Sequence, residues 1–414
     1  MALETISLYQ REGSSIYGCL LDCTKAFDTV QQSLLFKKLL DHKVPQVFIR
    51  LLIQIYVNQT ANVRWQNYIS SSFTLKNGVR QGAVLSPILF CFYMNGLFKE
   101  MKNSKNGCQV GPYYSGMLGY ADDLLLLCPS RGGLQEMLNI AQKYAQAHNV
   151  GFSTNPNPKK SKTKGMIFRH KNNKTEVAKL ELCNNKLPWV EGAKYLGIRL
   201  TDQINGLREN TYIKRARYIE RNCEINQEFH YVHPELKCKL NKIYNSSFPG
   251  SILWDLTSVA VQSLINTWSI SVRHMWNLPR ETHRSFIEPL GRVHAKTMLY
   301  SRFVKFVQSI TKGNKLEPIY LLESIKNNTQ TVTGRNIKLI LQDLNQRNIE
   351  KVKLEDIKSE IRLATMNQNE NWKIMTLKEL TNVKHKMMYI SDDNDEDFFT
   401  SKEIEIMIND IATF

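Results

Sequence analysis

Residues 118–128 read Leu-Gly-Tyr-Ala-Asp-Asp-Leu-Leu-Leu-Leu-Cys, so that two apolar arms flank an acidic pair. Apolar runs of this length, bounded by turn residues, are typical of buried strands. The segment is therefore predicted to be a β-hairpin with Asp122 and Asp123 at its tip. A pair of aspartates is also common in a solvated turn, but the four leucines that follow favour buried arms.

A second short apolar run, Ile16–Leu21, is predicted to be a buried strand that ends at Asp22. If these strands belong to one sheet, three carboxylates come together at their ends. Neighbouring carboxylates raise one another's pKa unless a cation binds, and hard oxygen ligands suit Mg²⁺. Two such ions can hold the attacking and leaving oxygens of a phosphoryl displacement. The three aspartates therefore indicate a site for two Mg²⁺ ions, with Mn²⁺ as the alternative.

The rest of the chain predicts a mixed α+β protein. Periodicity indicates helices at 34–40, 47–56, 87–101 and 134–147, a hairpin at 63–75, short strands at 166–168 and 195–200, and mostly helix beyond residue 206. The apolar stretch 252–272 is predicted to be a buried helix rather than a membrane span, because Asp255 and Asn266 interrupt it.

Lys and Arg (55) exceed Asp and Glu (38), which gives 414 residues a net charge of +17 and a pI near 9.4. This balance favours nucleic acid as the partner, an anionic membrane less so, although a merely basic solvated surface is the alternative. The eight cysteines form no C-x-x-C pair, and residues 1–10 have no signal-peptide pattern. We therefore expect an intracellular protein without a membrane partner, in the nucleus or the cytoplasm.

Five sequence blocks follow one another in a specific order. They are Asp22 with Thr24-Lys25-Ala26-Phe27-Asp28, Asn77-Gly78-Val79-Arg80-Gln81-Gly82 with Leu85-Ser86-Pro87, Tyr120-Ala121-Asp122-Asp123, Lys162-Thr163, and Tyr195-Leu196-Gly197. In this order and spacing they resemble motifs A to E of the palm of reverse transcriptases. The match is with the non-LTR retrotransposon, or long interspersed element, type. The resemblance covers residues 14–200 and continues more loosely to about Gly291.

The resemblance implies RNA-directed DNA polymerase activity, with dNTP as substrate and with an RNA template and a DNA primer as partners. Asp22 and Asp122 would be the main metal ligands, Asp123 would support them, and the main-chain carbonyl of Cys23 would help to hold the nucleotide-bound ion. Lys162 would donate a proton to the departing pyrophosphate. The oligomeric state stays open.

The substrate side of the site is also implied by the resemblance. Phe27 falls at the position beneath the sugar, where a bulky ring would exclude a ribose 2′-hydroxyl and so favour dNTP over NTP. Gln81 and Gly82 would lie against the incoming base pair, since glycine permits a close approach. Tyr120 is also expected to bind the substrate. Phe27 also disfavours the alternative of an RNA-dependent RNA polymerase.

Candidate nucleic-acid contacts lie in two regions. Lys159, Lys160 and Lys164 belong to the acid-free run 159–174, which is otherwise a solvated basic face. Tyr195 and Gly197 would grip the primer end, or else form an ordinary hairpin core. Arg273 and Arg280 would contact the template–primer duplex, or else decorate the outside of a helical bundle.

The domain prediction is a palm at 1–205, a thumb-like helical region at 206–300, a helical region at 301–390 and an acidic tail at 391–414. The palm is expected to be an antiparallel sheet packed on helices. The fingers motifs and the endonuclease of the family are expected well upstream of Asp22. The chain is therefore expected to be truncated at its N-terminus and weak or inactive alone, and the alternative is an inert relic or a co-opted palm that only binds nucleic acid.

Overall fold

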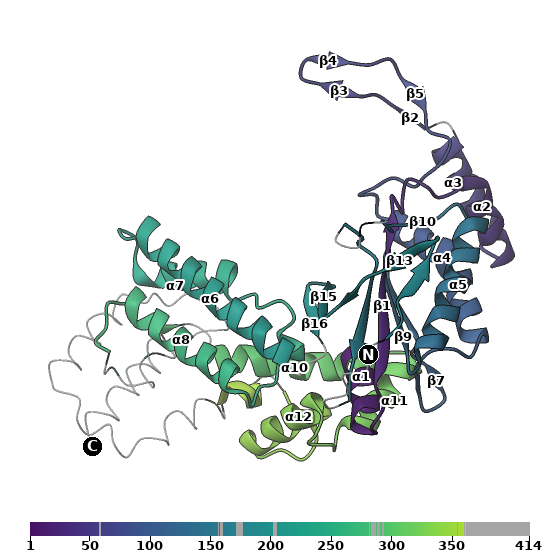
Figure 1. Cartoon of the computed structure of the whole chain (residues 1–414). Coiled ribbons are helices and arrows are strands. Elements are labelled where there is room, and N and C mark those ends of the chain that lie inside the picture. The colour runs from purple at the N-terminus through teal and green to yellow at the C-terminus, as the bar shows by residue number, and fades with distance from the viewer. Residues whose placement is uncertain are drawn as a thin grey trace. The chain divides into compact units, whose positions relative to one another are not determined.

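The computed structural model describes residues 1–57, 59–155, 157, 160–170, 177–201, 205–280, 282, 287, 290–291, 294–353, 355–359 and 361, without the side chains of 205–210. The chain divides into two compact units, Met1–Gln203 and Ile204–Phe414. Figure 1 shows a sheet with helices in the first unit and helices in the second. This arrangement confirms the predicted α+β class.

The main sheet of unit 1 is built around β1 (Ile16–Thr24). Its strand order is β14-β11-β1-β9-β8, and β10 pairs with the far end of β1. Every pairing is antiparallel except that of β14 with β11. The other strands are β8 (Met117–Tyr120), β9 (Asp123–Cys128), β10 (Gly151–Phe152), β11 (Lys164–Phe168) and β14 (Trp189–Val190).

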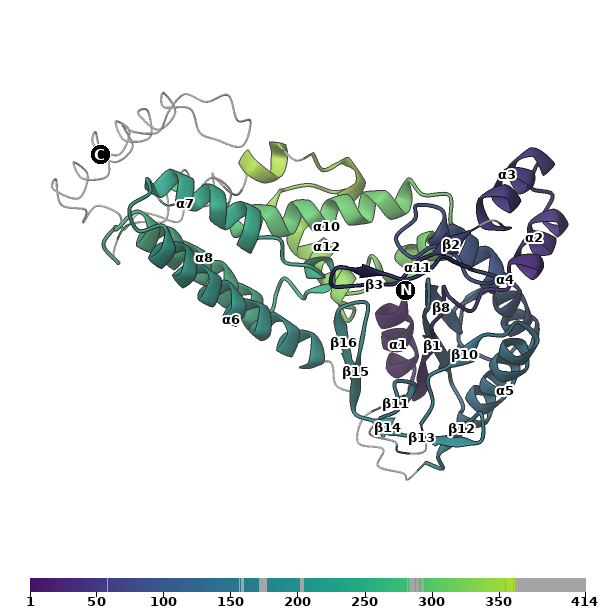
Figure 2. The ribbon, with the colours of Figure 1, turned by 90° about the horizontal axis from the view of Figure 1, so that it is seen from above.

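Both faces of this sheet are buried. Successive side chains of a strand point to opposite faces, and Cys19 and Leu21 of β1 pack in a core with helices α2, α4 and α5. Ile16 packs in a second core with Ile6 of helix α1. Figure 2 shows α1 on one side of β1 and both α4 and α5 on the other. These helices are α1 (Ala2–Arg11), α2 (Gln32–Asp41), α4 (Ser86–Asn103) and α5 (Arg131–Ala147).

A two-stranded ribbon follows α3 (Gln46–Val57) and extends away from the main sheet (Figure 1). It consists of β2 (Thr60–Ala61) paired with β5 (Phe73–Thr74), and β3 (Arg64–Trp65) paired with β4 (Tyr68–Ile69). The structure confirms the predicted hairpin here, and it confirms the helices predicted at 34–40, 47–56, 87–101 and 134–147.

The single strand predicted over 195–200 was wrong. Two strands, β15 (Gly192–Tyr195) and β16 (Ile198–Thr201), form a hairpin in which Tyr195 pairs with Ile198. The chain reverses at Leu196 and Gly197, whose φ angles of 47° and 81° lie in the left-handed region that glycine adopts without strain. Two further hairpins complete unit 1: β6 (Gln109–Val110) with β7 (Tyr113–Tyr114), and β12 (Leu180–Leu182) with β13 (Asn185–Leu187).

The described part of unit 2 is helical, as predicted, and residues 362–414, which include the predicted acidic tail, lie outside the described residues. Its core contains three nearly inaccessible tryptophans, Trp254, Trp268 and Trp276, together with Phe303. The helices are α6 (Asn205–Glu228), α7 (Pro234–Leu240), α8 (Val259–Met275), α10 (Ala295–Thr311), α11 (Leu316–Ile325) and α12 (Val332–Asp343), with short turns at Asn241–Asn245, Ser251–Leu253 and Ile349–Lys351.

The helix predicted over 252–272 begins later than expected. Ser258 caps α8 by accepting a hydrogen bond from the Val261 amide, and residues Ser251–Leu253 form a separate 3₁₀ turn. Within the described residues, no helix is both long enough and apolar enough to span a membrane.

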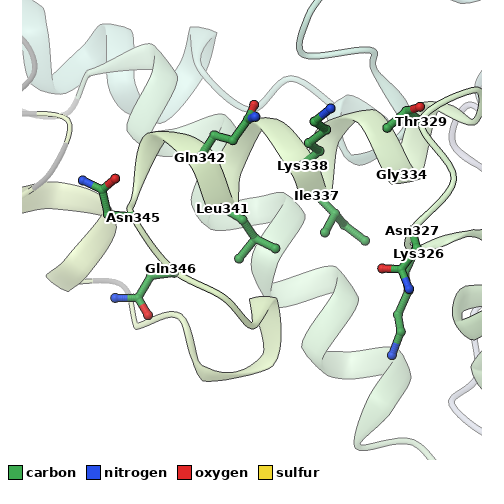
Figure 3. A pocket seen from close by; sticks show the side chains of 10 residues that line it. All are labelled: Lys326, Asn327, Thr329, Gly334, Ile337, Lys338, Leu341, Gln342, Asn345 and Gln346. Atoms are coloured by element: carbon green, nitrogen blue, oxygen red, sulfur yellow. The ribbon is translucent and has the colours of Figure 1, made fainter.

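Unit 2 also contains an open pocket of about 720 Å³ beside α12 (Figure 3). Lysine and amide side chains line it over an apolar floor that includes Ile337 and Leu341. None of the predicted site residues lines this pocket, so the candidate chemistry lies at the main sheet of unit 1.

Candidate active site

The candidate site lies where β1, β8 and β9 meet. Asp22 of β1 is directly opposite Asp123 of β9, although about a hundred residues separate them in sequence. Tyr120 pairs with Asp123 across the β8–β9 hairpin, so Ala121 and Asp122 form its two-residue turn. The φ of 53° at Ala121 belongs to this tight reversal. The structure thus confirms a hairpin with the acidic pair at its tip.

The sequence predicted that the first strand ends at Asp22, and this prediction was wrong. β1 continues to Thr24, because Cys23 and Thr24 find partners in Phe152 and Gly151 of β10. Asp22 is therefore held by hydrogen-bonded neighbours on both sides, and not in a loose strand end.

The side chains of Asp22 and Asp123 lie on the same face of the sheet. Directly opposite residues of an antiparallel pair have side chains on the same face, so Asp22 and Asp123 lie side by side. Burial, followed by the charges of Asp122 and Asp22, raises the pKa of Asp123. Burial and the same three carboxylates raise the pKa of the Cys23 thiol to about 12. Negative charge therefore accumulates at this end of the sheet.

The chemistry of these donors fits a magnesium ion. Mg²⁺ often binds to one or two carboxylates and fills its other positions with water and substrate phosphates, and Asp22 and Asp123 supply such a pair. Among the described residues, no group of three His, Cys, Asp or Glu side chains is arranged closely enough to hold a metal ion. The remaining ligands of an ion would come from the main chain, water or substrate.

Lys162 lies beside this pair. Its Nζ is 3.8 Å from Oδ2 of Asp22, and the two side chains are 73% and 34% exposed. An exposed pair at this distance contributes little to stability. The contact nevertheless places a proton-carrying ammonium group next to the carboxylates.

The main chain of Asp22 is fixed by residues around Ser153 and Thr163, of which only Thr163 stands in one of the five sequence blocks. The Ser153 amide donates to the Asp22 carbonyl at 2.8 Å, and the Asp22 amide donates to Oγ1 of Thr163 at 3.4 Å. Thr163 is fully buried, its amide donates to the Ser153 carbonyl, and Ser161 Oγ donates to the Thr163 carbonyl at 2.8 Å. Ser153, Ser161 and Thr163 therefore form an anchor for Asp22, which we call the Asp22 anchor.

Phe27 is tied to the segment that precedes Gln81. Its carbonyl accepts from the Val79 amide at 2.8 Å, and its ring packs against Phe90 with centroids 5.3 Å apart. Gly78 has a φ of 92°, and a Cβ there would lie 3.2 Å from the Phe27 carbonyl oxygen. The buried amide of Gln32 also donates to the Gly78 carbonyl at 3.1 Å. Gly78, which belongs to the second sequence block, and Gln32, which no block contains, thus hold the two blocks together.

Gln81 and Gly82 are exposed. Gln81 Nε2 lies 3.5 Å from Asp28 Oδ1, at the outer limit of a hydrogen bond. Gly82 has a φ of 82° and open space where a Cβ would lie. The positive φ is therefore sufficient to explain why a glycine occupies position 82. The close approach of Gly82 to an incoming base pair stays a prediction.

The structure brings one of the predicted primer-binding elements to the carboxylates. Tyr195 Oη donates to the Leu118 carbonyl of β8 at 3.4 Å, and burial together with the charge of Asp123 raises the pKa of Tyr195 to about 12. Gly197 lies in the adjoining turn, and Tyr120 on β8 is 69% exposed.

The basic candidates are more dispersed. Lys160 is exposed and Lys164 lies on β11 opposite Leu20, whereas Lys159 is outside the described residues. Arg273 and Arg280 belong to unit 2. Arg273 donates two hydrogen bonds to the Thr282 carbonyl, and Arg280 is exposed. Part of the hydrogen-bonding capacity of Arg273 is thus used within unit 2.

The chain is similar to known proteins. Residues 2–200 match the family described as reverse transcriptase (RNA-dependent DNA polymerase). The chain is 29% identical over 192 residues to the Pol polyprotein of the Drosophila melanogaster element R2DM, which covers 45% of this chain and 18% of that protein. It is 23% identical over 322 residues to the probable RNA-directed DNA polymerase from the transposon X-element of the same organism. This match covers 76% of the present chain and 31% of that protein. The chain thus spans less than a third of the length of these relatives.

Among solved structures, apo telomerase from Candida tropicalis aligns with a TM-score of 0.37 and 11% identity, over 92% of this chain and 55% of that one. A score of this size supports no inference about the present chain.

The Asp22 anchor predicts a specific stability effect. Thr163→Val keeps the shape of the side chain but leaves the Asp22 amide without its acceptor. We expect a loss of about 1 kcal/mol in the free energy of unfolding, measured by urea denaturation. Thr163→Ser retains the hydroxyl and should lie closer to the wild type, and a valine variant as stable as the serine variant would contradict the anchor.

The closely spaced carboxylates predict a substitution that increases stability, in contrast to Thr163→Val. Because its neighbours disfavour the charged form of Asp123, Asp123→Asn should raise the urea midpoint at neutral pH in the absence of divalent ions. Mg²⁺ should then stabilise the wild type more than this variant. Glu191→Gln, at an exposed position, is the matched control and should change neither quantity. An identical Mg²⁺ response in the wild type and Asp123→Asn would argue against a cation at these carboxylates.

Proposed function

Because residues 2–200 are a reverse transcriptase domain of the non-LTR retrotransposon type, we propose that this chain extends a DNA primer on an RNA template with dNTP as substrate. The observation that carries the proposal is the pairing of Asp22 with Asp123 across β1 and β9, with Asp122 in the adjoining turn. Nucleotidyl transfer needs little covalent chemistry from a protein, and it depends on charge stabilisation and positioning. Acidic side chains held at the tip of a rigid sheet meet both needs.

Asp22, Asp122 and Asp123, with the main-chain carbonyl of Cys23, would hold the divalent ions. Two Mg²⁺ ions, or Mn²⁺, supply charge neutralisation at the primer 3′-hydroxyl and at the triphosphate when they are bound. The primer 3′-hydroxyl would release its proton to water, its oxygen would form the new bond to the α-phosphorus, and the bond from the α-phosphorus to pyrophosphate would break. Lys162 would donate a proton to the leaving pyrophosphate, and its Nζ, 3.8 Å from Asp22 Oδ2, supports this role.

Phe27 is proposed to select the sugar. Its main chain is tied to Val79 and its ring is wedged against Phe90, so the side chain is held in place. A fixed apolar ring beneath the sugar clashes with a 2′-hydroxyl and offers it no hydrogen bond. Gln81, Gly82 and Tyr120 complete the proposed nucleotide side of the site, and each is exposed.

The template and primer are proposed to lie along the basic and aromatic residues near the carboxylates. Lys160 and Lys164 precede and begin β11, and the β15–β16 hairpin carries Tyr195 and Gly197. Tyr195 reaches the main chain of β8, beside the carboxylates. The net charge of +17 suits a polyanionic partner, and the duplex contacts assigned to Arg273 and Arg280 form part of the same proposal.

Primer extension tests the catalytic assignment. Wild-type protein should extend an annealed DNA primer on an RNA template in the presence of Mg²⁺, and the Asp122→Asn/Asp123→Asn double variant should lose at least about a hundredfold in rate, because charge stabilisation is removed. Glu191→Gln is the matched carboxylate control. If the wild type and the double variant give the same signal, the chain is instead a palm that binds nucleic acid without polymerising.

Sugar selection gives a second test. Phe27→Ala should lower the preference for dNTP over NTP by about ten- to a hundredfold, measured as the ratio of incorporation efficiencies. Phe27→Tyr keeps a ring of similar size and should retain the preference. A wild-type enzyme that incorporated NTP as well as dNTP would support the alternative of an RNA-dependent RNA polymerase.

A further inference from the structure

The ribbon that follows α3 ends in two exposed aromatic residues. Trp65 and Tyr68 are directly opposite each other on β3 and β4, and their side chains are 73% and 79% exposed. Opposite residues of an antiparallel pair share a face, so the two side chains lie on the same face of the ribbon. We call Trp65 and Tyr68 the aromatic tip.

Hydrogen bonds within the ribbon hold the aromatic tip in a defined position. The Ser70 amide donates to the Val63 carbonyl at 2.9 Å, and the Val63 amide donates to Ser70 Oγ at 2.9 Å. Asn62 donates to the Ser70 carbonyl at 2.8 Å and accepts from Ser72 Oγ at 3.1 Å. The ribbon is therefore a preorganised arm, which extends away from the main sheet (Figure 1). Its two aromatic side chains are exposed to solvent.

The aromatic tip lies in a stretch of sequence that contains basic residues and no acidic ones. The sequence contains no Asp or Glu from His42 to Lys99, whereas it contains Lys43, Arg50, Arg64, Lys76 and Arg80. Arg64 immediately precedes Trp65, and its Nε donates to the Gln66 carbonyl at 3.3 Å. This hydrogen bond draws the guanidinium group toward the turn, so that a positive charge lies at the end of the ribbon.

Exposed aromatic faces beside an arginine, in an acid-free segment, match the requirements of an unpaired nucleic-acid strand. Unpaired bases stack on aromatic side chains with about 1–3 kcal/mol per base, and basic groups neutralise the phosphates. Bases inside a duplex are already stacked and are not available in this way. An aliphatic protein-docking surface would not require the arginine or the absence of acids.

We propose that the aromatic tip binds single-stranded nucleic acid, with bases stacked on Trp65 and Tyr68 and a phosphate neutralised by Arg64. The proposal rests on the proposed function in one respect: the unpaired template RNA is the strand that would occupy the tip. The apolar residues exposed on α3, among them Val47 and Phe48, form a separate surface on which the proposal does not depend.

Equilibrium binding without dNTP provides the test. A fluorescently labelled oligouridylate, an oligothymidylate of equal length and a blunt RNA duplex are titrated with the full chain, and anisotropy gives each Kd. Trp65→Ala/Tyr68→Ala should weaken binding of the single strands at least tenfold and leave duplex binding unchanged, because only unpaired bases can stack. Trp65→Phe/Tyr68→Phe keeps two rings and should stay close to the wild type.

Salt dependence tests the role of Arg64. Arg64→Ala should reduce the slope of log Kd against log salt concentration by about one, since one phosphate contact is lost. Arg64→Lys keeps the charge and should retain the slope. A stronger effect on the oligouridylate than on the oligothymidylate identifies RNA as the preferred strand, and equal effects identify a site that accepts either strand; both results support the proposal.

Two outcomes overturn the proposal. One is wild-type affinity of Trp65→Ala/Tyr68→Ala for both single strands. The other is a wild-type dimer in sedimentation that this variant converts to a monomer without any change in nucleic-acid affinity, which would make the tip a protein interface. If the aromatic tip binds single strands but the wild type does not extend primers, only the proposed function is refuted. If the wild type extends primers but Trp65→Ala/Tyr68→Ala leaves the Kd for single strands unaltered, only the role of the aromatic tip is refuted.

Discussion

The antiparallel pairing of β1 with β9 is the interaction on which the candidate site depends. It runs from Tyr17 opposite Cys128 to Asp22 opposite Asp123, and the four leucines of β9 between them are buried on both faces of the sheet. A slip of one residue would move every side chain of β1 to the other face of the sheet. The apolar side chains of this pair therefore determine not only the core but also which carboxylates stand next to each other.

Placing charges together at the end of a buried sheet lowers stability. Partial burial, followed by the charges of Asp122 and Asp22, raises the pKa of Asp123 and so disfavours its charged form. The surrounding structure offsets this cost, because the strand is packed between two apolar cores and the main chain of Asp22 is held from both sides by Ser153 and Thr163. A site that concentrates charge on rigid elements is ready for a cation without having to rearrange.

The same unit also contains regions where apolar side chains meet solvent. The ribbon after α3 holds its shape by hydrogen bonds between its own strands, so its aromatic residues do not need a core to stay in position. The blocks around Phe27 and Gly78 are rigid for a different reason, since main-chain hydrogen bonds and a glycine that admits close contact join them. Rigid support thus exists both at the carboxylates and at the distant aromatic tip.

Local patterns in the sequence predicted most of the secondary structure and suggested a chemistry for the three aspartates. Periodicity predicted the helices that became α2 to α5, and two apolar arms around an acidic pair predicted the hairpin that carries Asp122 and Asp123, because each pattern reflects the burial of a single element. The sequence also supplied the motifs that point to the family and the excess of positive charge. Three features are visible only in the tertiary structure: the pairing of Asp22 with Asp123, the continuation of β1 onto β10, and the hydrogen bond between Asp22 and Thr163. Thr163 is 141 residues further along the chain than Asp22. The turn at Leu196 and Gly197 was missed because apolar content does not record a positive φ. Contacts between distant residues depend on strand register, and register is set by the sum of packing over the whole sheet, which no local pattern contains.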